Sequence, residues 1–319
     1  MARIVLAGGS GQVGGVLARA LQARGWEVVV LSRRPQPAPW RSVLWDGRAG
    51  GEWESFVSGA RALVNLAGRS VNCRYTPENR RQILESRLDS TRAIGAAIAR
   101  AKNPPAVWLQ ASTATIYAHR YDAPNDETSG IIGGGEPNAP DTWRFSIDVA
   151  TAWERALAEA ETPATRKGAL RSAMVMSPDR GGIFDTLLSL ARRGLGGTCG
   201  DGRQYVSWIH DADFVATILF LIERDELAGP VNLASPNPLP NADFMRILRQ
   251  AWGARIGLPA TQWMLEIGAR IIGTETELIL KSRRVTPMRL LQAGFTFEHP
   301  HWDEAARDLC ARRARMDSK

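Results

Sequence analysis

A glycine-rich turn near the N-terminus constrains the fold of this chain most strongly. The segment RIVLAGGSGQVGGVLARAL places Gly8, Gly11 and Gly14 between an apolar run typical of a strand and an amphipathic stretch typical of a helix. Glycine allows a tight turn and a close ligand approach, and the N–H groups at a helix N-terminus attract phosphate. The turn predicts a dinucleotide diphosphate site formed by Gly8, Gly9, Ser10, Gly11, Gln12, Val13 and Gly14.

The first two-thirds of the 319 residues alternates short β-branched runs with helical stretches. We expect helices near 12–24, 77–101 and 143–161, and strands at 3–7, 27–31, 42–45, 62–66, 106–111 and 169–175. Such alternation is typical of a parallel sheet covered by helices on both faces. The predicted fold class is therefore α/β, a Rossmann-type doubly wound parallel sheet.

The regular alternation of strand and helix patterns ends after about residue 175. A glycine-rich loop and a proline-punctuated stretch follow, WIHDADFVATILFLIE returns to strand and then helix, and the remainder from Pro240 is mostly helical. We predict a Rossmann domain of residues 1–175 plus 206–228. A smaller, mostly helical C-terminal substrate domain would comprise 176–205 plus 229–319.

The residues after the second expected strand favour NADP(H) over NAD(H). Ser32, Arg33 and Arg34 stand there without a carboxylate, and guanidinium groups bind a 2′-phosphate that a carboxylate would repel. Solvated loop charges are the alternative for the arginines. Asp46 either meets the adenine or forms a turn. The adenosine ribose and diphosphate would pass Leu66, Ala67 and Gly68.

Composition narrows the class of protein. Three widely spaced cysteines fit a reducing compartment, and four histidines without a ligand cluster give no reason to expect a metal. The net charge of +7 comes mostly from scattered arginines, so we expect no nucleic-acid partner. No apolar run approaches about 18 residues and the start does not resemble a signal peptide. We expect a cytoplasmic protein with a small-molecule substrate and no membrane segment, and a homodimer stays open.

The segment QASTATIYA follows the fifth expected strand, at the sheet edge where such folds bind ligands. Its residues 113–117 resemble the S-x-x-V-Y segment of extended short-chain dehydrogenases of the sugar-nucleotide epimerase type. The resemblance implies that the hydroxyl of Thr113 contacts the reacting carbonyl or carbinol. Ser112 would contact the cofactor, and Tyr117 is the catalytic partner we predict, with Tyr121, His119 or water as alternative proton donors.

The helix expected at 143–161 departs from that family. Counting along it places Ser146 and Ala150 where the family keeps a tyrosine and, four residues on, a lysine. A tyrosine has a pKa of about 10, and without a nearby lysine it stays protonated at neutral pH. Such a pocket can donate a proton but is poorly equipped to remove one. The sequence therefore predicts an NADP(H)-dependent oxidoreductase that reduces an unidentified carbonyl.

Further segments narrow the resemblance to an atypical branch, the "epimerase family protein" or nucleoside-diphosphate-sugar epimerase-like group. They include the stretch VNLAGRSVNCRYTPENRRQILESRLDSTRAI, the pair Trp153-Glu154, and SRRVTPMRLLQAGFTFEHP near the end. The resemblance implies that the missing tyrosine-lysine pair is a property of the branch. This chain departs from the branch at Ile116, Ala118 and His119, where members commonly carry glycine, tyrosine and glycine.

Two other functions stay open beside carbonyl reduction. One is a non-catalytic sensor that binds NADP(H), and the other is a sugar-nucleotide epimerase or dehydratase with a non-standard base. Arg87 either binds an anionic substrate or forms a helix-surface salt bridge. In WIHDADF we expect Trp208 to pack and Asp213 to cap a helix, with His210 as general acid the minor alternative.

Overall fold

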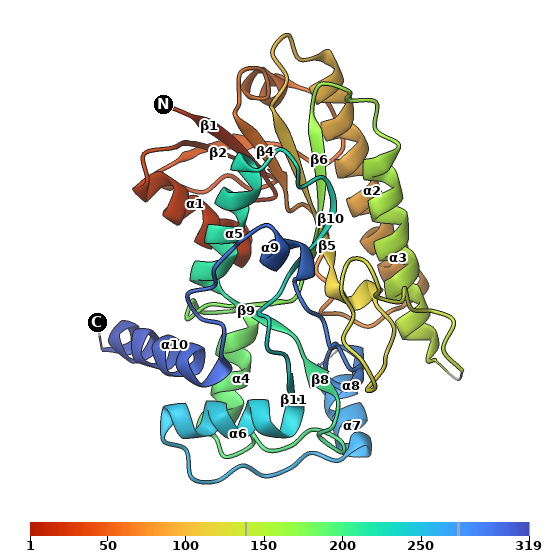
Figure 1. The fold of residues 1–319 in the computed structure, drawn as a ribbon, viewed down its shortest axis with the longest axis vertical. Coiled ribbons are helices and arrows are strands. Elements are labelled where there is room, and N and C mark those ends of the chain that lie inside the picture. The colour runs from red at the N-terminus through yellow and green to blue at the C-terminus, as the bar shows by residue number, and fades with distance from the viewer. Residues whose placement is uncertain (138, 273–274, 319) are drawn as a thin grey trace.

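The computed structural model describes residues 1–137, 139–272 and 275–318. These residues form a seven-stranded parallel sheet in the order β10-β6-β5-β4-β1-β2-β3 (Figure 1). The parallel doubly wound fold predicted from the alternation is thereby confirmed. The strands are β1 (Arg3–Ala7), β2 (Glu27–Ser32), β3 (Arg41–Leu44), β4 (Ala62–Asn65), β5 (Val107–Thr113), β6 (Arg166–Ser172) and β10 (Gly229–Leu233).

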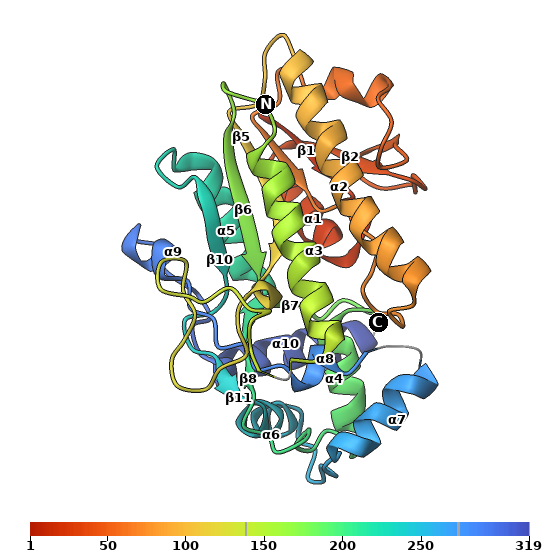
Figure 2. The same ribbon diagram turned by 90° about the vertical axis from the view of Figure 1, so that its right-hand side faces the viewer.

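Helices cover both faces of this sheet (Figure 2). One face packs against α1 (Gln12–Ala23) and α5 (Asp211–Glu223), and the other against α2 (Pro77–Arg100) and α3 (Asp141–Ala158). Each helix turns an apolar stripe inward; Leu17 and Leu21 of α1, for example, are fully buried. The expected helices agree with α1, α2 and α3 to within three residues.

The sixth expected strand, 169–175, is not continuous. The chain leaves the main sheet after Ser172, and β7 (Met174–Met176) pairs with β9 (Trp208–His210) in a separate two-stranded sheet. An apolar run cannot by itself show which sheet each part joins. The carboxyl end of β6 therefore marks the passage from the large sheet to the lower part of the molecule in Figure 1.

The lower part has its own apolar core. It lies between α4 (Ile183–Arg192), α6 (Asn241–Trp252) and α10 (Trp302–Asp317), with a two-stranded sheet of β8 (Tyr205–Val206) and β11 (Leu239–Pro240) beside them. The predicted boundary at residue 229 needs correction, because β10 pairs with β6 in the large sheet. The rest of the predicted domain division stays a prediction.

The C-terminal region is mostly helical, as expected. It contains α7 (Gln262–Ile272), α8 (Glu277–Leu280) and α9 (Met288–Gln292), and two 3-10 turns occur earlier, η1 (Glu52–Phe56) and η2 (Ala114–Ile116). The segment after α8 returns to the large sheet beside the end of β5: Lys281 Nζ donates to Thr115 O at 2.8 Å and Arg283 Nε to Thr115 Oγ1 at 3.0 Å. Within the described part of the chain, no helix is both long enough and apolar enough to span a bilayer.

Candidate functional site

The glycines of the first turn are required by close packing. Gly8 has φ +72°, and a Cβ there would lie 2.6 Å from the Cα of Ala67. A Cβ on Gly14 would lie 2.5 Å from the Cα of Gly9. Side chains at Gly8 and Gly14 would therefore push the turn away from β4 and from α1, so the sequence builds a backbone cradle at the carboxyl end of β1.

The N-terminus of α1 is open to an anion. Its N-cap is Gly11, which offers no side-chain acceptor to the first N–H groups, and no acidic residue lies in the first turn. The amide Nε2 of Gln12 is buried and has no hydrogen-bond partner among the described residues. Free N–H groups, the positive end of the helix dipole and a spare amide all fit a dinucleotide diphosphate.

Most residues predicted to contact the cofactor line connected hollows around this turn. Val13 is an exception, since its side chain packs against the core of the sheet. One hollow, of about 380 Å³, is lined among others by Gly8, Ser10, Gly11, Ser32, Arg33, Asp46, Leu66, Ala67 and Gly68. Gly9 and Gln12 line the adjoining hollow.

Two arginines follow β2 beside the diphosphate turn. Ser32 Oγ donates to Ser10 Oγ at 3.0 Å, and the backbone N–H of Arg34 donates to Ser32 Oγ at 3.2 Å. Arg33 and Arg34 are exposed and line a hollow of about 670 Å³ together with the two serines. In the described residues neither arginine has an acidic partner. The arrangement suits a phosphate better than a neutral hydroxyl.

Asp46 forms a turn, which is one of the two roles predicted for it. Its Oδ1 accepts hydrogen bonds from the N–H groups of Arg48 and Ala49, at 2.9 and 2.8 Å, and these bonds lower the pKa of its carboxyl. Asp46 also lines the 380 Å³ hollow, so a contact with the adenine remains a prediction.

A separate cavity, of about 240 Å³, lies at the carboxyl end of β5. Thr113 Oγ1 accepts from the N–H of Thr115 at 3.1 Å, and its O–H has no acceptor in the described part of the chain. Helix α3 brings Ser146 and Ala150 to the same cavity. Its polar lining residues are Tyr75, Arg87, Ser112, Thr113, Thr115, Ser146 and Glu277. Thr113, whose hydroxyl is predicted to contact a substrate, therefore lines this cavity. Ser146 and Ala150, at the positions of the family's tyrosine and lysine, line it too.

Tyr117 is a correction to the predicted site. It is 2 % exposed, its O–H donates to Asn232 Oδ1 at 2.9 Å, and it accepts from Arg171 Nη1 at 2.9 Å. Burial also raises the pKa of the phenol. Arg171 in turn forms two hydrogen bonds of 2.8 Å with Glu154. The tyrosine thus belongs to a buried structural network and not to the cavity that Thr113 lines.

The alternative donors near Thr113 are also held elsewhere. His119 Nδ1 accepts from the N–H of Ser282 at 2.8 Å, so the ring carries its proton on Nε2 and fastens the C-terminal segment. Burial lowers the pKa of His119. The ring of Tyr121 packs edge-on against it, 5.0 Å between centroids. His119 is therefore a half-buried ring that anchors the segment after α8.

Sequence reasoning missed Glu277, the carboxyl group of the cavity. Ser146 Oγ donates to Glu277 Oε2 at 2.5 Å and lies 3.4 Å from the hydroxyl of Tyr75. Burial raises the pKa of both Tyr75 and Glu277. Glu277 is 131 positions from Ser146, and no spacing pattern connects the two. Only docking of the C-terminal segment places this carboxyl beside α3.

Arg87 follows neither alternative fully. Its guanidinium donates to the backbone oxygens of Arg69 and Ile83, at 3.1 and 2.9 Å, and lies over the ring of Trp153. Desolvation lowers the pKa of the guanidinium to about 10. In the described residues it has no carboxylate partner, which removes the salt-bridge alternative, and it lines the cavity. Arg87 is therefore a cation on the cavity wall whose binding of a substrate anion stays a prediction.

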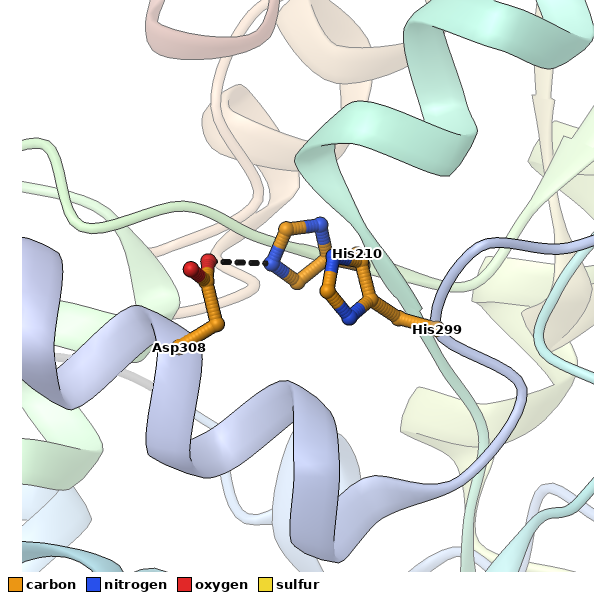
Figure 3. A group of neighbouring side chains, drawn as sticks. All are labelled: His210, His299 and Asp308. Carbon is orange, nitrogen blue, oxygen red and sulfur yellow. Dashed lines mark hydrogen bonds and ion pairs between the residues drawn. The ribbon is translucent and has the colours of Figure 1, made fainter.

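Figure 3 shows a further polar cluster, which the sequence did not predict: His210, His299 and Asp308, whose ligand-type atoms lie within 4.8 Å of one another. Nδ1 of His210 accepts from the N–H of Ala212, and Nε2 lies 3.1 Å from Asp308 Oδ2. Burial lowers the pKa of His210 to about 4, so the ring is neutral. Helix capping and hydrogen bonding account for this group, which lies outside the cavity.

The expected roles in WIHDADF are partly exchanged. Trp208 packs in the lower core as predicted. His210, not Asp213, caps α5, while Asp213 accepts from the N–H groups of Glu298 and His299 at 2.7 and 3.0 Å. A carboxylate in the first turn of a helix can accept from the helix's own N–H groups or from those of a distant loop. Sequence spacing does not show which of these donors Asp213 binds.

Comparison with known proteins identifies the family. A model of the NAD dependent epimerase/dehydratase family matches residues 4–234, which is most of the chain. This protein belongs to that family. A second model, a domain of unknown function (DUF1731), matches residues 260–309, so Glu277 comes from that segment and Thr113 and Ser146 from the first. The cavity is built where the two matched segments meet.

Within the family the chain resembles proteins named epimerase family protein. The Bos taurus epimerase family protein SDR39U1 is 31% identical over 97% of this chain and 100% of the relative. The crystal structure of the human SDR39U1 protein with NADPH has a TM-score of 0.83 at 28% identity, covering 97% of this chain and 99% of that one. A nucleoside-diphosphate sugar epimerase from Corynebacterium glutamicum has a TM-score of 0.74 at 27% identity, covering 100% of this chain and 62% of the other. The resemblance to the epimerase-like branch is confirmed.

Proposed function

We propose that this protein reduces a small carbonyl compound with NADPH. The observation that carries the proposal is the state of the cavity's polar groups. Thr113 offers a hydroxyl, and burial raises the pKa of Tyr75 and of Glu277, so both retain their protons to higher pH. Such groups can donate to a forming alkoxide, whereas an epimerisation or an oxidation must begin with a base.

The phosphorylated cofactor is supported by Arg33 and Arg34 beside the diphosphate turn, and by the human relative that was crystallised with NADPH. When bound, NADPH supplies a hydride to the carbonyl carbon. The chain's own residues hold its diphosphate at the N-terminus of α1 and its 2′-phosphate at the arginines. Thr113 donates a hydrogen bond to the substrate oxygen as negative charge develops on it.

Cavity size and charge support a small substrate. About 240 Å³ is below the roughly 300–1,000 Å³ typical of sites for drug-sized ligands. Arg87 on its wall suits an anionic substituent such as a carboxylate. We therefore propose a small aldehyde, ketone or 2-oxo acid in preference to a nucleotide sugar.

The test is NADPH oxidation, followed by absorbance, over a panel of small aldehydes, ketones and 2-oxo acids. Thr113→Val should lower kcat by about 10²–10³-fold, as removal of an oxyanion donor does elsewhere, and Thr113→Ser should retain most activity. Tight NADPH binding without any oxidation would instead favour the sensor. Scrambled sugar stereochemistry without net NADPH consumption would favour the epimerase.

A further inference from the structure

Glu277 is the carboxyl group of the cavity. It begins α8, is 1 % exposed and lines the cavity together with Thr113 and Ser146. Its Oε2 accepts the short hydrogen bond from Ser146 Oγ. Its other oxygen, Oε1, is fully buried and has no hydrogen-bond partner in the described residues. One oxygen of the carboxyl is thus held by Ser146, and the other has no partner among the described residues, in a residue that lines the cavity.

The unpartnered oxygen favours the acid form. An ionised carboxylate would leave a buried, charged oxygen without a donor, which is costly, whereas a protonated Oε1 is a neutral donor. Burial is the main cause that raises the pKa of Glu277, and the charge of Glu275 acts in the same direction. Arg283, Ser146 and Lys281 act in the opposite direction, and burial outweighs them.

We propose that Glu277 is the catalytic acid of this protein, and that Ser146 is the residue that positions it. The inference rests on the proposed reduction. The hydride forms a new C–H bond at the carbonyl carbon, the electron pair of the C=O π bond moves to oxygen, and that oxygen takes the proton from Oε1 of Glu277. The products are an alcohol, the oxidised cofactor and the Glu277 carboxylate, which regains its proton from water.

The surroundings of Glu277 suit both states of this cycle. After transfer, the carboxylate keeps the Ser146 hydrogen bond and faces the positive charges of Lys281 and Arg283. Ser146 stands where the family keeps its tyrosine, so the acid reaches the cavity from the C-terminal segment instead of from α3. This arrangement supplies a proton donor without a tyrosine-lysine pair.

The first test needs no substrate. Infrared spectra of the full-length protein with NADPH at pH 7 should contain the C=O stretch of a protonated carboxyl, and Glu277→Gln should lack it. The band should disappear as pH rises, because the acid form is lost above the raised pKa. Glu266→Gln on the exposed surface of α7 is the matched control and should keep the band. A spectrum in which Glu277 is ionised at pH 7 would overturn the proposal.

The second test uses a carbonyl that the panel shows to be reduced. Glu277→Gln should lower kcat by about 10²–10⁴-fold with an unchanged Kd for NADPH, since the amide cannot give up a proton. The wild-type kcat should fall with rising pH, and the residual activity of the variant should not. Unchanged kcat in Glu277→Gln would overturn the donor role even if the band is present. A wild-type protein that reduces nothing refutes the proposed reduction, and the donor role with it, whatever the infrared spectra show.

Discussion

Removing Arg33 and Arg34 together tests how the chain distinguishes NADPH from NADH. Both guanidinium groups lie beside the turn that would hold the diphosphate, in a hollow they share with Ser10 and Ser32. A hydrogen bond to a charged group contributes about 1.5–3 kcal/mol, and because both arginines are exposed we take the lower end. At about 1.4 kcal/mol per tenfold, each arginine changes the Kd for NADPH about tenfold and the pair about 100-fold.

The assay is a fluorescence titration of each cofactor into wild type, Arg33→Ala, Arg34→Ala and the double variant. The Kd for NADH should change little, since NADH lacks the 2′-phosphate. Arg24→Ala, at the exposed end of α1, is the matched control for loss of positive charge. The difference between wild type and double variant should shrink at high salt. Equal losses for NADPH and NADH, or a wild type that prefers NADH, would refute the assignment of these arginines.

Three further predictions follow from the packing. Gly14→Ala places a Cβ 2.5 Å from the facing backbone and should weaken NADPH binding at least tenfold by titration, whereas Gly15→Ala, whose Cβ meets only a flexible side chain at 3.5 Å, should bind normally; equal affinities would contradict the cradle. Arg171→Met leaves Glu154 buried without its cation and should lower the free energy of unfolding in urea by about 3–5 kcal/mol, and a loss under about 1 kcal/mol would show that the network relaxes. The pKa of Glu277 is raised in the folded state, so its contribution to the free energy of unfolding is present at low pH and is lost as pH rises from the ordinary pKa of a glutamate through the raised pKa. The free energy of unfolding of Glu277→Gln, measured in urea, should not show this loss. Parallel pH profiles of the two proteins would argue against the raised pKa.

The fold could be predicted where local pattern and final environment agree. Strand β1 and helix α1 carry their own apolar periodicity and a turn between them that only glycine fits, so their bounds were expected almost to the residue. The run 169–175 was less informative. Its residues suit any buried strand, and the break at Ala173 depends on a pairing with Trp208–His210 that local sequence does not encode.

The residues of the candidate site could likewise be predicted only in part from local sequence. Thr113 was found because it directly follows a strand of a parallel sheet, and ligands bind at that edge. Tyr117, four residues on, has the right chemistry but points into a buried network with Arg171 and Asn232. The turn between these two residues includes η2, and its geometry decides which hydroxyl reaches the cavity.

The sequence by itself determined the doubly wound sheet, the glycine-rich turn before α1, the arginines after β2 and the absence of a lysine from α3. Each of these depends on residues that are neighbours along the chain or that repeat with a strand or helix period. The tertiary structure alone decided that Glu277 lies against Ser146, because the contact joins positions 131 residues apart. Burial at that contact sets the protonation of the carboxyl, and burial is a property of the packed chain that no local pattern contains.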